Sequence, residues 1–169
     1  MILRHPVAEY FFTLNVDPRP KARPKVYRWA TVNPSQKDEE LAARHFDECE
    51  GKPHNPLNGQ IFVWFKFFVT PPKSTPQWKK PLMDRGIIRP NKSPDLDNYV
   101  KLILDALNGR LWEDDRYIVE MHSVKFYTTT TPRIEIKVVE YPELSRKDAK
   151  QLELDDEQLS LNGFFNEIQ

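Results

Sequence analysis

The chain has little cysteine and little glycine, and both shortages exclude classes of protein. Cys49 is the only cysteine among 169 residues, which excludes an internal disulfide framework and any cysteine-based zinc site. Four histidines are scattered without the spacing of metal ligands: His5, His45, His54 and His122. Five glycines stand against 15 prolines, which predicts long, stiff loops.

Long hydrophobic runs are also absent. The longest apolar stretch, residues 61–68, is interrupted by Lys66, and the N-terminal residues lack the pattern of a signal peptide. We therefore expect no membrane span and no export signal. The sequence predicts a soluble intracellular protein.

Net charge is zero, but the charges are unevenly distributed. Residues 1–142 carry 22 basic and 18 acidic side chains, whereas residues 143–169 carry three basic and seven acidic ones. The length suits one domain with a sizeable core. We predict a mildly basic domain at residues 1–142, followed by a charged tail at residues 143–169.

The apolar patterns predict four strands and two helices. The strands are expected at residues 9–16, 59–70, 117–127 and 132–141, and the helices at residues 35–49 and 95–108. Both faces of the second strand are largely apolar, which predicts a central strand with helices or a partner subunit on its second face. The last two strands are expected to form a hairpin through threonines 128–131. This β-α-β-α-β-β order predicts an α+β fold with a mixed β-sheet packed with helices.

Two proline-rich segments concentrate positive charge. Residues 18–28 hold five basic side chains and no acid, and prolines at 18, 20 and 24 predict an extended arm without strand or helix. Residues 71–93 form a second basic loop that leads into the helix at 95–108. We interpret both as contacts to a DNA backbone, the alternative being solvated loops. The candidate DNA-binding residues are Arg19, Lys21, Arg23, Lys25, Arg28, Lys79, Lys80, Arg89 and Lys92.

The most informative stretch is PDLDNYVKLILDALNGRLWEDD, from Pro94 to Asp115. It predicts an amphipathic helix that begins after an N-cap at Asp95 and ends at Asn108-Gly109. Its core-facing residues are expected to be Leu96, Val100, Ile103 and Leu107. Asp95 and Asp97 lie where an extended backbone becomes helical, so their carboxylates are expected to converge there.

A third carboxylate, Asp114 or Asp115, follows this helix. Two carboxylates about 4 Å apart repel by roughly 4 kcal/mol at an effective dielectric constant of about 20, so such a cluster must bind a proton or a cation. Lys101 offsets only one charge, which predicts a divalent metal: Mg²⁺, with Mn²⁺ as a substitute. Lys101 itself would support an attacking or leaving oxygen.

A purely structural interpretation of the same acids is also open. Asp95 would cap the helix, and Lys101 would join Asp97 and Asp105 in an i,i+4 ladder of ion pairs. Residues 113–115 would then form a turn.

The segments DLDNYVK at 95–101, LDALNG at 104–109 and WEDDRYIVE at 112–120 resemble the RusA family of Holliday-junction resolvases. RPKARPKV at 19–26 and PRIEI at 132–136 extend the resemblance over most of residues 9–141. It implies a homodimeric, Mg²⁺-dependent endonuclease that resolves four-way DNA junctions by paired nicks in recombination and repair. Such an enzyme would act in the cytoplasm or nucleoid, or wherever the host DNA is replicated.

The resemblance also implies residue roles. Asp95, Asp97 and Asp115 would bind the metal and Lys101 would be the catalytic lysine. Two alternatives to a junction resolvase stay open: a flap or branched-DNA nuclease of the same chemistry, and a non-catalytic DNA-binding adaptor whose acids are structural.

The tail contains QLSLNGFF at residues 158–165, which resembles the PIP box that docks replication proteins on PCNA-type sliding clamps. Gln158 would enter a polar pocket, and Leu161, Phe164 and Phe165 would form an apolar plug. QLSL also resembles bacterial clamp-binding peptides. The alternative is a tail that folds back and buries both phenylalanines.

Overall fold

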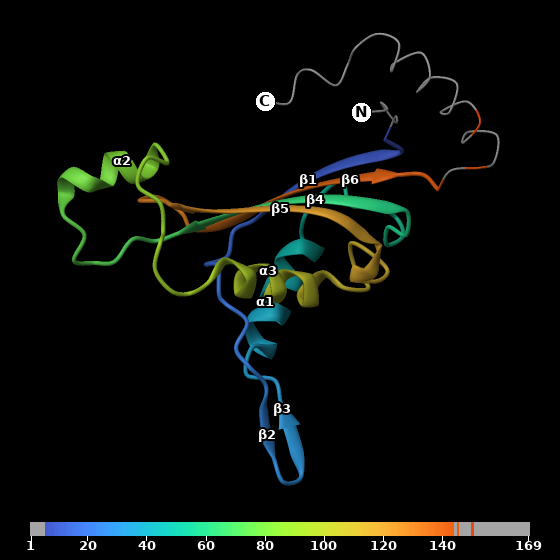
Figure 1. Cartoon of the computed structure of the whole chain (residues 1–169), viewed down its shortest axis with the longest axis horizontal. Helices are drawn as coiled ribbons and strands as arrows, with labels where there is room; N and C mark the ends of the chain where they lie inside the picture. Colours follow the sequence, from blue (N-terminus) through green and yellow to red (C-terminus); the bar gives the residue numbers. More distant parts are fainter. Residues whose placement is uncertain (1–5, 144, 146–149, 151–169) are drawn as a thin grey trace.

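A four-stranded mixed sheet carries the fold in the computed structural model, which describes residues 6–143, 145 and 150. The strands are β1 (Ala8–Leu14), β4 (Gln60–Val69), β5 (Ile118–Tyr127) and β6 (Arg133–Tyr141), in the spatial order β1-β6-β4-β5. β4 pairs parallel with β5 and antiparallel with β6, which in turn pairs antiparallel with β1. Helices α1 (Gln36–Asp47) and α3 (Leu96–Leu107) cover one face (Figure 1). The predicted α+β fold is confirmed.

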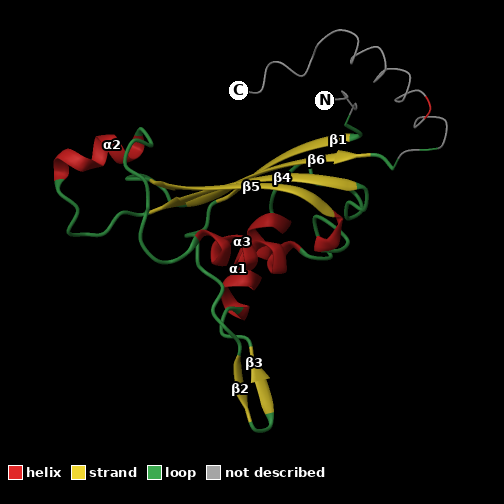
Figure 2. Ribbon diagram, viewed as in Figure 1, coloured by secondary structure: helices red, strands yellow, loops and turns green. Residues whose placement is uncertain are grey.

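The core lies between this sheet and the two helices. β4 is central and turns Ile61, Val63, Phe65 and Phe67 toward them, each at most 1% exposed. From α3 come Val100, Ile103 and Leu107, three residues of the predicted stripe, whereas its first member, Leu96, is only partly buried. Figure 2 shows α1 and α3 on this side of the sheet and α2 beyond the end of the sheet.

The opposite face of the sheet is aromatic and open among the described residues. Phe62, Trp64 and Phe68 of β4 are only partly buried, and Phe11 of β1 is 67% exposed. The rings pair along the surface, with Trp64 stacked on His122 at 5.7 Å between centroids. A helix layer on this face, one of the two predicted coverings, is absent from the described part of the chain.

The predicted hairpin of the last two strands is wrong. β4 lies between β5 and β6, with Val63 opposite Met121 on one side and opposite Val138 on the other. α3 forms the crossover that places β5 parallel to β4, and β6 then fills the position between β4 and β1. β5 is therefore an edge strand of the described sheet, next to α3.

The predicted arm is extended only in part. Its prolines all precede Lys25, and residues 25–32 form a hairpin of β2 (Lys25–Tyr27) and β3 (Ala30–Val32) that projects beyond α1 and α3 (Figure 1). The prediction of no strand there is wrong, because no proline interrupts this segment.

The proline-rich loop of residues 71–93 also contains structure. It holds a 3₁₀ turn at Gln77–Lys79 and the short helix α2 (Lys80–Asp84), which extend past the end of the sheet (Figure 1). Among the described helices, none has the length and apolar character needed to cross a membrane.

Candidate active site

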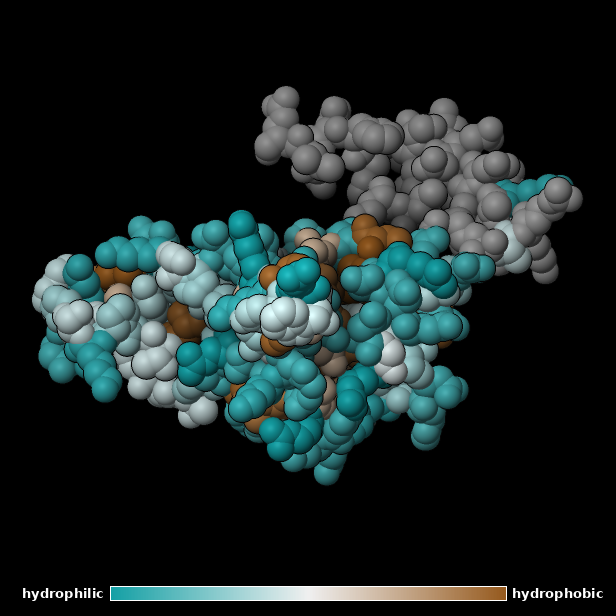
Figure 3. Space-filling view, turned by 90° about the horizontal axis from the view of Figure 1, so that it is seen from below, coloured by the Kyte–Doolittle hydropathy of each residue, from teal (hydrophilic) through white to brown (hydrophobic). Residues whose placement is uncertain are grey.

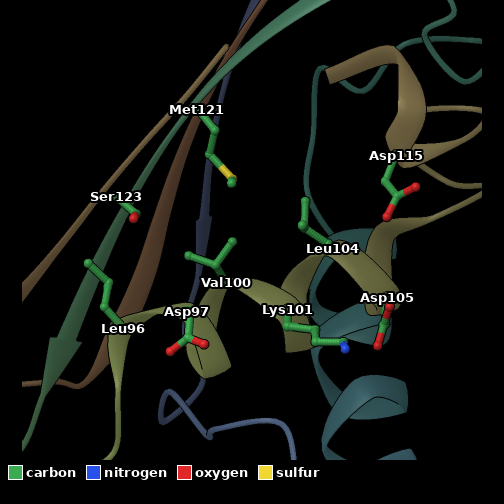
Figure 4. A pocket seen from close by; sticks show the side chains of 9 residues that line it. All are labelled: Leu96, Asp97, Val100, Lys101, Leu104, Asp105, Asp115, Met121 and Ser123. Atoms are coloured by element: carbon green, nitrogen blue, oxygen red, sulfur yellow. The ribbon is translucent and has the colours of Figure 1, made fainter. Parts of the chain in front are cut away.

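A pocket of about 600 Å³ lies between α3 and the edge strand β5 (Figure 4). Its charged residues are Asp97, Lys101 and Asp105 of α3 and Asp115 of the 3₁₀ turn that follows (Asp115–Tyr117). The remaining wall consists of Leu96, Val100 and Leu104 of α3 and Met121 and Ser123 of β5. The charged residues of α3 recur every four positions, so they share one face of the helix, beside the face that packs in the core.

The predicted ligands are placed differently by the fold. Asp97 and Asp115 line this pocket, whereas Asp95 does not. Asp95 occupies the N-cap position with an extended backbone (φ −71°, ψ 149°), as predicted, but its carboxylate makes no capping hydrogen bond. The described residues contain no group of three or more acidic, histidine or cysteine side chains arranged to hold a metal. Convergence of Asp95 with Asp97 stays a prediction.

Lys101 lies between Asp97 and Asp105 in the pocket (Figure 4). Within the described part of the chain Lys101 forms no ion pair with either one, and Asp105 pairs with Lys21 at 2.6 Å. The structural ladder of i,i+4 ion pairs is therefore not formed. Lys101 is an exposed residue that lines the pocket and is available to an anionic ligand there.

The two neighbouring acids after α3 have different surroundings. Asp114 Oδ1 accepts a hydrogen bond from the main-chain N–H of Arg116 at 3.0 Å and caps the 3₁₀ turn. Asp115 is exposed and lines the pocket. The turn thus uses the first carboxylate and presents the second one to the cavity.

The N-terminal basic residues divide into two groups. Lys21 is only 11% exposed and pairs with both Glu39 and Asp105, and Arg19 pairs with Asp17 at 2.9 Å. The others, Arg23, Lys25 and Arg28, are exposed in and beside the β2–β3 hairpin. Arg19 is exposed as well, but within the described part of the chain only Arg23, Lys25 and Arg28 of these five are free of an ion pair.

The second basic set belongs to the extension around α2. Arg89 and Lys92 are exposed, and Lys79 and Lys80 are partly buried. Lys79 lies 5.3 Å from the ring centroid of Trp78, and Arg89 lies 4.4 Å from that of Phe126. The charged groups of Lys79 and Arg89 thus lie over aromatic rings, and both side chains keep some exposed surface.

Sequence reasoning missed three polar contributors. Asp105 repeats the four-residue spacing of Asp97 and Lys101, a signal that could have placed it in the pocket. Ser123 carried no signal, because its position depends on the parallel pairing of β5. Lys125, also on β5, donates a hydrogen bond to the carbonyl of Pro94 at 2.8 Å and holds the segment that enters α3.

The pocket offers oxygen donors of the kind that bind Mg²⁺. Mg²⁺ prefers oxygen ligands and is typically bound by one or two carboxylates while the other positions hold water or substrate phosphate. Asp97 and Asp115 supply two such carboxylates on one cavity. Lys101 adds a fixed positive charge to the same cavity.

Comparison with known proteins gives two matches. A family model described as "Endodeoxyribonuclease RusA" matches residues 15–139, which include every residue of the pocket. The uncharacterized protein YqaN of Bacillus subtilis (strain 168) is 35% identical over 91 residues, which cover 53% of this chain and 63% of YqaN. The match thus spans less than two thirds of the length of that relative.

Proposed function

The chain belongs to the RusA family of endodeoxyribonucleases, and from this membership we propose that it is a metal-dependent endonuclease that resolves four-way DNA junctions. The observation that carries the proposal is the shared pocket of Asp97, Lys101 and Asp115, which lies inside the matched region. Branched DNA as the substrate is also supported by the exposed basic residues of the neighbouring hairpin.

The proposed chemistry assigns separate tasks to the pocket residues. Asp97 and Asp115, with Asp95, would hold Mg²⁺ or Mn²⁺, which when bound neutralises phosphoryl charge and activates water. Lys101 places its ammonium group against the phosphate oxygens and stabilises negative charge that develops there. Leu96, Val100 and Leu104 form the apolar wall of the same pocket, beside these charged side chains.

A homodimer and a sliding clamp are the proposed partners. Paired nicks require two active sites, and the open aromatic face with Phe11, Phe62, Trp64 and Phe68 supports contact with a second copy. The clamp would bind Gln158, Leu161, Phe164 and Phe165, which lie outside the described residues. Tethering would raise the local concentration of the nuclease at DNA.

The decisive experiment compares two adjacent substitutions on a synthetic four-way junction with Mg²⁺. Asp115→Asn is expected to reduce nicking by about a hundredfold or more, because it removes a carboxylate from the pocket. Asp114→Asn is the matched control and is expected to keep its activity, because Asp114 caps the turn outside the pocket. Equal activity of both variants would contradict the assigned site.

The same assay separates the alternatives. A wild-type protein that binds junctions but never nicks them would be an adaptor, and one that cuts flaps in preference to four-way junctions would be a nuclease of different specificity.

For the tail, replacing Phe164 and Phe165 with alanine is expected to abolish clamp binding and leave junction cleavage intact. Unchanged affinity for every sliding clamp tested would remove the clamp proposal.

A further inference from the structure

The β2–β3 hairpin exposes apolar side chains that the fold does not use. All six strand residues are exposed, and four large apolar side chains stand out: Val26 at 80%, Tyr27 at 51%, Trp29 at 85% and Val32 at 46% exposure. A two-stranded ribbon is marginally stable by itself, and clustered apolar exposure of this kind marks a binding surface. Figure 3, which looks toward the hairpin tip, shows hydrophobic patches among hydrophilic side chains on this side.

The tip residues are not explained by turn chemistry. Tyr27 pairs with Ala30, so Arg28 and Trp29 form the two-residue turn. Tight hairpin turns favour glycine, asparagine or aspartate with positive φ, and neither of these residues has positive φ. Since the turn does not require a tryptophan, its placement at the most projecting point indicates contact with a ligand.

The base of the hairpin is fixed to the helices. Ala22 donates its main-chain N–H to Ser35 Oγ at 2.7 Å, and Asn33 donates to Glu39 at 3.0 Å. On the other side, the N–H of Lys21 donates to the carbonyl of Asn98 in α3 at 2.8 Å. The hairpin therefore has a set direction relative to the helix that carries Asp97 and Lys101.

A second cavity, of about 350 Å³, lies between the hairpin base and α3. Its wall includes Arg23 and Thr31 from the hairpin side and Asn98 from α3. Lys101 and Asp105 line both this cavity and the active-site pocket. The two cavities thus adjoin at Lys101, and together they lead from the hairpin to the proposed catalytic residues.

Charge identifies the occupant. The sequence from Pro18 to Lys37 contains no acidic residue, and Arg23, Lys25 and Arg28 are exposed around the apolar tip. Aromatic side chains among cations match single-stranded or unstacked nucleic acid, where bases stack on rings and phosphates meet cations. A second protein copy with the same positive hairpin would be repelled by it.

We propose that the hairpin is a wedge for branched DNA: Trp29 stacks on an unstacked base at the branch point, and Arg23, Lys25 and Arg28 contact flanking phosphates. This inference deepens the proposed function and rests on it, because it assumes a branched DNA substrate. It assigns a binding role to Trp29 and leaves the bond-breaking chemistry to the pocket.

The test measures binding of the full chain to a synthetic four-way junction and to linear duplex, with divalent metal removed so that no cleavage interferes. Trp29→Ala is expected to weaken junction binding by about fivefold to a hundredfold, the range for loss of one base–aromatic stack. Duplex binding is expected to stay unchanged, because an intact duplex offers no unstacked base. Trp29→Phe keeps a ring and is expected to retain most of the junction affinity.

Two controls separate stacking from other effects. Val7→Ala removes exposed apolar surface elsewhere, since Val7 is 64% exposed at the start of the sheet, and is expected to leave both affinities unchanged. Arg28→Ala is expected to weaken junction and duplex binding alike and to reduce the salt slope of log K by about 1. A junction with 2-aminopurine at the branch point should show a fluorescence change on binding that Trp29→Ala diminishes.

Four outcomes would overturn the inference. Junction affinity unchanged in Trp29→Ala while the wild type binds junctions would refute the wedge alone and leave the proposed function standing. Equal losses on junction and duplex would show that the ring does not read unstacked bases. Loss of self-association in Trp29→Ala, measured by sedimentation, would assign the hairpin to a contact between copies. A wild type that binds no branched DNA would remove the proposed function and the wedge together.

Discussion

Replacing Lys21 with methionine tests how the hairpin base is held on the domain. The Lys21 ammonium group joins Glu39 of α1 to Asp105 of α3, and the side chain is only 11% exposed. Methionine keeps most of the side-chain volume and removes the charge, so the change isolates the ion pairs. The two carboxylates are left without their shared partner.

The expected cost is about 2 kcal/mol. Removing one partner of a fully buried ion pair costs roughly 3–5 kcal/mol. Here the residual carboxylates are better placed, because Glu39 still accepts two hydrogen bonds from Asn33 at 3.0 and 3.1 Å and Asp105 is 37% exposed to water. At an m-value of about 2 kcal/mol per M, the urea midpoint should fall by about 1 M.

Urea unfolding followed by circular dichroism checks this value, with Lys37→Met as the control. Lys37 lies exposed on α1 and forms no ion pair with another described residue, so the same chemical change should alter the midpoint little. Equal midpoints for the two variants would refute the idea that Lys21 has a structural task. A salt slope of DNA binding reduced by about 1 in Lys21→Met would instead assign Lys21 to a phosphate.

The same pairs give a dependence on pH. Burial by itself lowers the pKa of Lys21, but the hydrogen bonds and charges of Asp105 and Glu39 outweigh it and raise the pKa above its ordinary value. The stabilisation is therefore fully present below the unfolded pKa of about 10.4 and is lost as the pH rises through the folded one. As Lys21 loses its proton, the difference in unfolding free energy between wild type and Lys21→Met should shrink in that alkaline range.

Three further predictions concern the scaffold. Gly59→Ala should lower the unfolding free energy by about 1 kcal/mol or more, because its Cβ would lie 2.6 Å from the carbonyl oxygen of Tyr141; an unchanged urea midpoint would contradict this. Hydrogen bonds from Thr129 hold the pKa of Asp84 below its ordinary value, so Thr129→Val should raise that pKa in an NMR titration, and stability from this contact is lost only as the pH falls through the folded pKa. Burial raises the pKa of the Cys49 thiol, so alkylation at pH 8 should be slower in the native protein than in urea, and equal rates would argue against burial.

The sequence predicts the elements with strong periodicity and fails where pairing depends on distant residues. The stripe of Val100, Ile103 and Leu107 specifies α3 because a helix period is local information. The order of β4, β5 and β6 in the sheet does not follow from local sequence. The sequences of β5 and β6 have the apolar pattern of two strands in a hairpin, and strands that follow one another in the chain usually pair. β4 separates β5 from β6, because the crossover through α3 places β5 on the other side of β4 from β6.

The site shows the same division. Asp97, Lys101 and Asp115 lie within 19 residues of one another, and their presence in one pocket follows from one helix and its exit turn. The pairing of Lys21 with Asp105 could not be foreseen, because 84 residues separate the partners in the chain. Trp29 was overlooked because a tryptophan in a short segment gives no sign of its exposure.

The pairing of β1 with β6 has a consequence for folding during synthesis. The sheet aligns Ala8 with Glu140, and the N–H of Val7 donates to the carbonyl of Glu140 at 2.8 Å, so the first described strand pairs only with the last one. Such distant pairing is slow, because a long loop must close before any contact forms. Until β6 has left the ribosome, β1 and the apolar central strand β4 both lack a neighbour that they need. Ribosome-bound chains that stop before Arg133 should therefore depend on chaperones in a way that the full domain does not.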